Sequence, residues 1–209
     1  EWLPSAPAHI LIYRYLGLEE TMPQLAPIPL LLKPDGNGKL SKRDKSDLPM
    51  FPLNWYDERT KESYTGYREH VFFPEAFINM LDMLGWNAGN NQEIYSKEEL
   101  INLFSFERVN KAGAKFDPEK TKWFNQQYLR KKSDEELAEL FKPLLLEELK
   151  KANVGESHIS HLTSQVFLKG FCRLIKEKAH FVNEFWNLGS FFFIAPITYD
   201  AEVLKKRLN

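Results

Sequence analysis

The sequence predicts a mainly α-helical protein that holds more than one module. From residue 73 onward, apolar residues recur at helical spacing. Two Ser-x-x-Glu capping boxes precede such segments, at Ser96–Glu99 and Ser133–Glu136. The first 48 residues instead carry a short apolar run between Pro- and Gly-rich turns, which is typical of a strand leading into a loop. Because 209 residues are many for one compact domain and few for two full ones, we expect two modules.

The N-terminal part should contain one short helix and one strand. Residues 5–17 (SAPAHILIYRYLG) are expected to be helical, with Ser5 as the cap, Pro7 in the first turn and Gly17 as the left-handed stop. The apolar run at 28–32 (IPLLL) predicts a buried strand that enters the loop PDGNG.

Residues 48–72 are rich in aromatic residues and Pro and show no clear periodicity. Linkers seldom carry so many aromatic residues, so a structured loop or an insertion is expected here. The sequence suggests no function for this segment.

The remainder should be helical almost throughout. We expect helices over 73–86, 96–104, 117–132, 133–152 and 157–181, and a last one that begins near Asp200. Asp117 and Pro118 suit the start of the third of these, and Pro143 should break or kink the fourth near Phe141. The apolar stripes are expected to run through Phe77, Met80, Leu81 and Leu84; through Trp123, Phe124 and Tyr128; and through Ile159, Leu162, Val166, Cys172 and Ile175.

Composition excludes several classes of protein. The net charge of −1 indicates no general affinity for nucleic acid, so any basic surface must be local. No stretch has the apolar length of a membrane helix, and the run FFFIAP, which ends at Pro196, should be core between helices. The single cysteine, Cys172, excludes an internal disulfide framework and fits a reducing compartment. His158 and His161 are three residues apart but have no Cys or acidic residue at metal-ligand spacing, so no metal site is expected.

The basic string KLSKR, Lys39 to Arg43, lies on a loop that contains Gly36 and Gly38. Mobile lysine charges and a flat guanidinium can wrap an anion that changes during a reaction, and Ser41 could donate a further hydrogen bond. The alternative is a hydrated basic turn, which is the commoner meaning of such a string taken alone.

A second basic cluster covers residues 107–132, where eight Lys or Arg face three acidic residues. It can be a solvated helix face, or it can follow an RNA backbone and neutralise phosphates. The candidates for phosphate contact are Lys111, Lys115, Lys120, Lys122, Arg130, Lys131 and Lys132.

Several strings together resemble a known family. LPSAPAHILIYRYLG…PIPLLLKPDGNGKLSKRDK is similar to the second half of the nucleotide-binding domain of class I aminoacyl-tRNA synthetases, including their Lys-hydrophobic-Ser-Lys-Arg signature. FPEAFINMLDMLGW, EIYSKEELINLFSFERVNKAGAKFDPEKTKWFNQQYLR and FWNLGSFFFIAP resemble the bacterial-type glutamyl-tRNA synthetases in particular, in the family's order. The helical C-terminal half also resembles these enzymes rather than the glutaminyl-tRNA synthetases, whose anticodon-binding part is a β-barrel.

The resemblance implies the tail of a Rossmann-like α/β nucleotide domain (1–48), a connecting, stem-contacting domain (49–132) and the start of an all-helical anticodon-binding domain (133–209). It implies Lys42 as the catalytic residue. It also implies an ATP site, whose members would be Trp2, Leu30, Leu31, Lys39, Leu40, Ser41, Lys42 and Arg43, with Glu1 near the substrate pocket. Leu30, Leu31 and Leu40 could equally be plain core residues.

The family's His-Ile-Gly-His-type motif does not occur in the chain. We therefore expect a fragment that lacks roughly the first half of the enzyme, forms no glutamyl-adenylate by itself and binds no cofactor tightly. The parent enzyme is expected to be a cytoplasmic monomer that uses L-glutamate, ATP with Mg²⁺ and the tRNA for glutamate. The alternative is a non-catalytic helical module that binds RNA or another protein.

Overall fold

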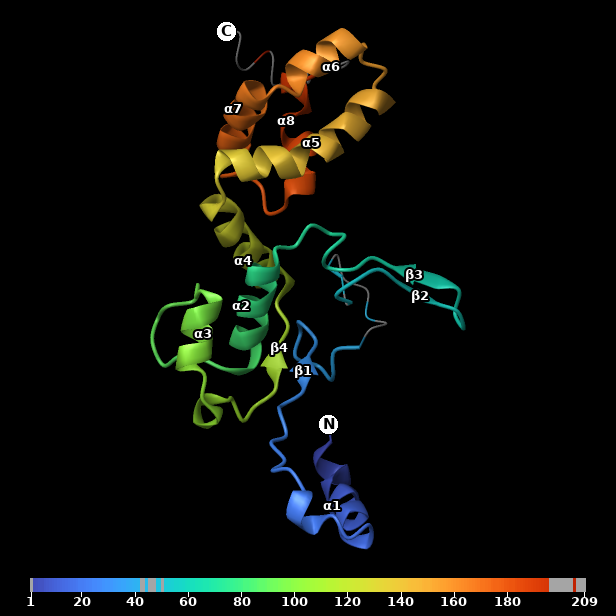
Figure 1. Cartoon of the computed structure of the whole chain (residues 1–209), viewed down its shortest axis with the longest axis vertical. Helices are drawn as coiled ribbons and strands as arrows, with labels where there is room; N and C mark the ends of the chain where they lie inside the picture. The colour runs from blue at the N-terminus through green and yellow to red at the C-terminus, as the bar shows by residue number, and fades with distance from the viewer. Residues whose placement is uncertain (1, 42–43, 45–47, 50, 196–204, 206–209) are drawn as a thin grey trace.

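A computed structural model describes residues 2–41, 44, 48–49, 51–195 and 205. Its elements, in chain order, are η1 (Leu3–Ser5), α1 (Ala6–Tyr15), η2 (Glu19–Thr21), β1 (Leu31–Leu32), β2 (Trp55–Asp57), β3 (Glu62–Tyr64), α2 (Pro74–Gly85), α3 (Lys97–Leu103), η3 (Phe106–Arg108), β4 (Ala114–Lys115), α4 (Pro118–Lys131), α5 (Asp134–Lys151), α6 (Glu156–Leu162), α7 (Gln165–Ile175), η4 (Val182–Glu184), α8 (Phe185–Gly189) and η5 (Ser190–Phe192). Along the long axis, α1 lies at one end, β1, β4, α2 and α3 lie in the middle, and α5 to α8 lie at the other end (Figure 1). The mainly helical fold class is confirmed.

The N-terminal helix α1 forms where the sequence predicts it, and Gly17 follows it with a left-handed φ of 69°. Ser5 precedes the helix but does not cap it, because its hydroxyl donates to the Trp2 carbonyl oxygen at 2.9 Å. None of the residues of α1 is buried.

The strand predicted over 28–32 is shorter than expected. Only Leu31 and Leu32 form β1, which pairs in parallel with β4 in the register Leu31↔Ala114 and Leu32↔Lys115. Leu31 is 39% exposed, so the prediction of a buried strand is wrong for it. Its side chain lines a cavity instead of the core.

The aromatic segment 48–72 is structured, as expected, and contains the antiparallel β2–β3 hairpin, which the sequence did not reveal. Trp55 and Tyr64 are paired across the hairpin, and their rings stack at 5.5 Å between centroids. Leu48 and Tyr67, which flank the hairpin, are buried in the main core. The hairpin therefore projects from the molecule on an anchored base (Figure 1).

Most helix boundaries follow their predicted caps. Both capping boxes form, and the Asp117 side chain accepts hydrogen bonds from the N–H groups of Glu119 and Lys120 at the start of α4. In α2, Met80 is buried as expected, but Leu81 is 45% exposed and faces a cavity.

Two of the predicted helices have features that the sequence left open or missed. Of the break or kink predicted near Phe141, the structure shows the kink: α5 continues through Pro143, and its ribbon changes direction partway along (Figure 1). Leu137 and Phe141 before Pro143, and Leu145 and Leu149 after it, are all buried, so packing on both sides holds the helix together.

The single helix predicted over 157–181 is two helices, α6 and α7. The chain turns at Thr163, whose hydroxyl donates to the Ile159 carbonyl oxygen, and Ser164 is extended with ψ 143°. Val166, in the first turn of α7, is 85% exposed, so its predicted place on the apolar stripe is wrong.

The main core runs from Leu48 to Phe193 and joins the middle part of the molecule to the C-terminal helices. Cys172 is buried in it, as expected. Among the described residues of the run FFFIAP, which end at Ala195, only Phe193 is buried, whereas Phe191 and Phe192 are exposed. The helix predicted near Asp200 lies outside the described residues.

Over the part of the chain that the structure describes, no helix is long and apolar enough to cross a membrane.

Candidate functional site

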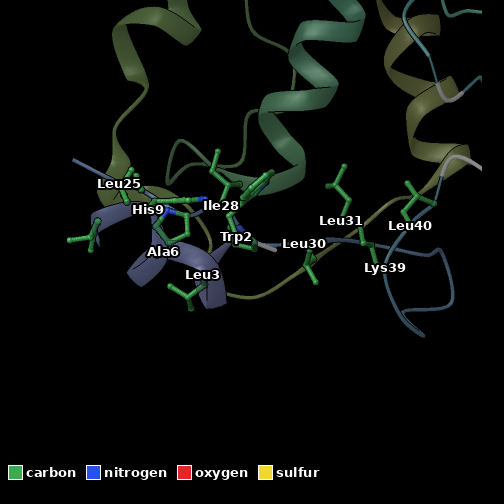
Figure 2. A pocket seen from close by; sticks show the side chains of 14 residues that line it. Trp2, Leu3, Ala6, His9, Leu25, Ile28, Leu30, Leu31, Lys39 and Leu40 are labelled. Carbon is green, nitrogen blue, oxygen red and sulfur yellow. The ribbon is translucent and has the colours of Figure 1, made fainter. Parts of the chain in front are cut away.

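An apolar cavity of about 780 Å³ lies between α1, the segment before β1 and the start of the basic string. It brings together residues that the sequence analysis assigned to nucleotide binding: Trp2, Leu30, Leu31, Lys39 and Leu40. Trp2 lies on the α1 side of this cavity, and Leu31, Lys39 and Leu40 lie on the β1 side (Figure 2).

Further residues of this cavity were missed from the sequence. They are Leu3, Ala6, His9, Ile10, Leu25, Ala26, Pro27, Ile28 and Pro29. The rings of Trp2 and His9 lie 5.6 Å apart (Figure 2). Apolar residues on one helix face and next to prolines are typical of a protein core. The sequence therefore gave no local indication that these residues line a cavity.

The chemistry of this cavity suits a flat, weakly polar ring that carries an anionic group. Apolar side chains cover most of its wall, and Lys39 supplies a positive charge at the end where the basic string begins. Cavities of this kind bind a ring through apolar contact and orient it through a few polar groups.

The turn that precedes the basic string needs glycine at two positions. Gly36 and Gly38 have φ values of 80° and 90°, a region that residues with a Cβ seldom adopt. The Lys33 N–H donates to the Gly38 carbonyl oxygen at 3.1 Å, and the Leu40 N–H donates to the Leu31 carbonyl oxygen at 2.8 Å. These bonds fold the start of the basic string back onto β1.

Ser41 is not part of the cavity lining, but it is fixed by a neighbour. Its N–H donates to Asp44 Oδ2 at 2.6 Å, and Asp44 Oδ1 lies 2.9 Å from Lys33 Nζ. The hydrogen bond from Lys33 and the one from the Ser41 N–H hold the pKa of Asp44 below its ordinary value, and Asp44 raises the pKa of Lys33. Lys42, Arg43 and Glu1, which the sequence analysis singled out, lie outside the described residues.

Four of the seven cations in the second set already have acidic partners within the protein. Ion pairs join Lys120 to Glu93 (2.5 Å), Lys122 to Glu119 (2.9 Å), Arg130 to Glu177 (3.1 Å), and Lys132 to Glu75 (3.8 Å) and Glu136 (3.6 Å). Among the described residues, Lys111, Lys115 and Lys131 have no such partner.

Lys115 lies apart from the lysines of α4. It belongs to β4, and its side chain crosses Gly36, where an added Cβ would come within 2.6 Å of Lys115 Cε. It therefore lies beside the turn that precedes the basic string. Lys131 lies over the Tyr128 ring, 5.6 Å from its centroid.

A second cavity, of about 830 Å³, shares the segment from Ala26 to Pro29 with the first. On its other side it is lined by residues of α2, α3 and η3 or next to them, including Leu81, Trp86 and Phe106. No group of three or more His, Cys, Asp or Glu that could hold a metal ion occurs within the described ranges.

Comparison with known proteins defines the class of protein. Residues 1–123 match the family model described as tRNA synthetases class I (E and Q), catalytic domain, and residues 136–209 match one described as an anticodon binding domain. The chain belongs to the class I tRNA synthetases of the E and Q type.

Two of the relatives that are most similar in sequence are glutamate–tRNA ligases. The glutamate–tRNA ligase of Porphyromonas gingivalis is 51% identical over 209 residues, and that of Flavobacterium psychrophilum is 53% identical. The match to the Porphyromonas protein covers 99% of this chain and 39% of that protein. The match to the Flavobacterium protein covers 98% of this chain and 38% of that protein. The predicted resemblance to glutamyl-tRNA synthetases is thus confirmed, and the chain spans about 39% of the length of these relatives.

Two solved structures with a similar fold are also glutamate–tRNA ligases. The crystal structure of a glutamate tRNA ligase from Elizabethkingia meningosepticum, in complex with its amino acid, has a TM-score of 0.82 and 43% identity, and the match covers 100% of this chain and 39% of that one. A glutamate-tRNA synthetase from Elizabethkingia anophelis has the same TM-score at 44% identity, over 98% of this chain and 39% of that one.

Proposed function

We propose that this chain is part of a glutamate–tRNA ligase, which joins L-glutamate to its tRNA through a glutamyl-adenylate. The observation that carries the proposal is the apolar cavity. It gathers Trp2, Leu30, Leu31, Lys39 and Leu40 from three separate stretches, in a chain about 50% identical to glutamate–tRNA ligases. The chain contributes this part of the nucleotide site and its tRNA-binding helices.

In the proposed site the adenine ring of ATP is bracketed by Leu30, Leu31 and Leu40, with Trp2 at the far wall. Lys39, Ser41 and Arg43 shape and close the loop around the phosphates. The magnesium ion enters with ATP as part of the substrate.

The reaction proceeds by attack of the glutamate carboxylate on the α-phosphorus of ATP, with pyrophosphate as the leaving group. Negative charge moves toward the leaving oxygens during this step. A lysine placed there stabilises the transition state more than the bound substrates, and we assign this role to Lys42. The loss of one such charge costs about 3 kcal/mol, or two to three decades of rate.

The tRNA is bound by the segment 49–132 and by the helices of 133–209. Lys111, Lys115 and Lys131 are the strongest of the seven candidate cations, because glutamates already neutralise the other four within the protein. Phosphate neutralisation by these side chains would supply affinity without sequence specificity. We further propose a cytoplasmic, monomeric enzyme.

The test is a charging reaction with the full-length gene product that contains residues 1–209. It combines ATP, Mg²⁺, tRNA for glutamate and labelled glutamate, with labelled glutamine in a parallel reaction. We expect acid-precipitable glutamyl-tRNA and no reaction without ATP. If tRNA is bound but no amino acid is attached, the product is an RNA-binding module and the ligase proposal fails.

A further inference from the structure

We propose that Asp44 and Lys33 are positioning residues, which hold the basic string in the geometry that the reaction needs. The inference rests on the proposed ligase function and adds two residues that lie outside the Lys-hydrophobic-Ser-Lys-Arg signature. Neither touches the cavity that gathers the nucleotide-site residues.

Asp44 binds Ser41 through both its backbone and its side chain. The Ser41 N–H donates to Asp44 Oδ2 at 2.6 Å, and the Asp44 N–H donates back to the Ser41 carbonyl oxygen at 2.9 Å. In the sequence, Lys42 and Arg43 are the two residues between the joined positions.

Lys33 ties this unit to β1. Its Nζ lies 2.9 Å from Asp44 Oδ1, the carboxylate oxygen that Ser41 does not use. The backbone of Lys33 is itself fixed, because its N–H donates to the Gly38 carbonyl oxygen and its own carbonyl oxygen accepts from the Gly36 N–H at 2.8 Å. The basic string is therefore fixed at two points: the Leu40 N–H binds β1, and Ser41 is linked through Asp44 to Lys33, which directly follows β1.

Such an arrangement favours a role in positioning over a role in stability. The side chains of Lys33 and Asp44 are 39% and 26% exposed, and ion pairs at this exposure add little to the stability of a fold. A charge-assisted, two-oxygen contact does restrict orientation, however. Transition-state stabilisation depends steeply on the placement of the charged group, so a looser loop should slow the reaction.

The Lys33–Asp44 ion pair also determines which lysines can bind the phosphates of ATP directly. The Lys33 charge is matched by the Asp44 carboxylate 2.9 Å away, which like an ordinary aspartate is ionised at neutral pH. Lys33 therefore acts on the substrate only through the loop that it holds.

The test measures kcat and KM for ATP in the charging reaction, with the full-length gene product and five variants. These are Asp44→Asn, Asp44→Glu, Lys33→Met, the double variant Lys33→Met/Asp44→Asn, and a control. The control is Arg14→Met, which breaks the exposed Arg14–Glu19 ion pair (2.8 Å) at the end of α1; Arg14 is neither in the cavity lining nor in the segments assigned to tRNA binding.

We expect Asp44→Asn and Lys33→Met each to lower kcat about tenfold, with a smaller change in KM. The double variant should be no slower than the slower single variant, because the two residues act as one unit. Asp44→Glu, which keeps the charge, should recover part of the loss. All of the variants should melt within a few degrees of the wild type, and Arg14→Met should charge tRNA at the normal rate.

Normal kcat in Asp44→Asn, or losses that multiply in the double variant, would overturn the proposal while leaving the ligase function intact. A loss of rate that is matched by a large fall in Tm would show a structural role instead. Failure of the wild type to charge tRNA would overturn the proposed function itself, and this inference with it.

Discussion

The side-chain oxygen of Asn125, in α4, accepts a hydrogen bond from the N–H of Phe73, which precedes α2, at 2.8 Å. The same amide donates through Nδ2 to the His180 carbonyl oxygen at 2.6 Å. Asn125 is fully buried. One side chain therefore joins the middle part of the molecule to the loop that follows α7, and it satisfies two backbone groups that are distant in sequence.

Replacement of Asn125 by Ala should destabilise the chain strongly. It leaves the Phe73 N–H and the His180 carbonyl oxygen without their partner, and each unsatisfied buried group costs about 1–3 kcal/mol. We expect the free energy of unfolding, measured in urea, to fall by about 2–4 kcal/mol. Asn110→Ala, at an exposed asparagine, is the matched control and should change it by less than about 0.5 kcal/mol. Equal effects at the two positions would show that the Asn125 hydrogen bonds are not what holds these segments together.

Cys172 should be almost unreactive while the protein is folded. Burial raises the pKa of its thiol to about 12, so the reactive thiolate is scarce at pH 8 and the sulfur is covered. In the unfolded chain the pKa returns to its ordinary value. The stability that comes from the neutral thiol is therefore complete below that value and is lost as pH rises toward 12.

Labelling with an aromatic disulfide reagent measures the reactivity of the Cys172 thiol. At pH 8 we expect the reaction to be at least about a hundredfold slower in buffer than in denaturing urea. Similar rates in the two solutions would mean that α7 opens readily, or that the thiol is accessible in the native protein.

The ion pairs of the described cations lead to a prediction about tRNA binding. Replacing Lys111, Lys115 and Lys131 with Ala should weaken binding and reduce the slope of log K against log salt by about 2. Replacing Lys120, Lys122 and Arg130 removes the same charge from side chains that already have glutamate partners, so the slope should change less.

Fluorescence anisotropy of the chain with labelled tRNA for glutamate, across a salt series, measures both triple variants. An equal change in slope for the two sets would show that the internal ion pairs do not decide which cations reach phosphate. Unchanged slopes in both would mean that these side chains are only solvated.

The sequence predicted those features that depend on local chemistry. The caps at Ser96, Asp117 and Ser133 form because a side-chain oxygen and a nearby backbone N–H are enough to start a helix. The left-handed stop at Gly17 depends equally on a single residue. Helix ends that depend on one or two neighbouring residues can be predicted without knowledge of the tertiary structure.

The errors arose where tertiary packing decides. The predicted helix over 157–181 is divided because two polar residues, Thr163 and Ser164, form a turn. At Pro143 the sequence left a break or a kink open, and buried leucines on both sides keep α5 continuous. Leu31 and Leu81 face cavities, although their spacing is that of core residues.

The candidate site was predicted in part. The resemblance indicated Trp2, Leu30, Leu31, Lys39 and Leu40, which line one cavity. It gave no sign of His9. It also gave no sign of the Lys33–Asp44 pair, because ten residues separate the two charges in the sequence and only the turn at Gly36 and Gly38 brings them together.

Lys42→Ala tests whether the basic string serves the transfer of the phosphates in a glutamate–tRNA ligase. The measurement is the single-turnover rate of glutamyl-tRNA formation by the full-length gene product, with Arg14→Ala, at an exposed residue of α1 outside the cavity lining, as the control. We expect Lys42→Ala to be about 100- to 1,000-fold slower with an unchanged Tm, and the control to react normally. A rate within twofold of the wild type for Lys42→Ala would remove this string from the mechanism and contradict the account.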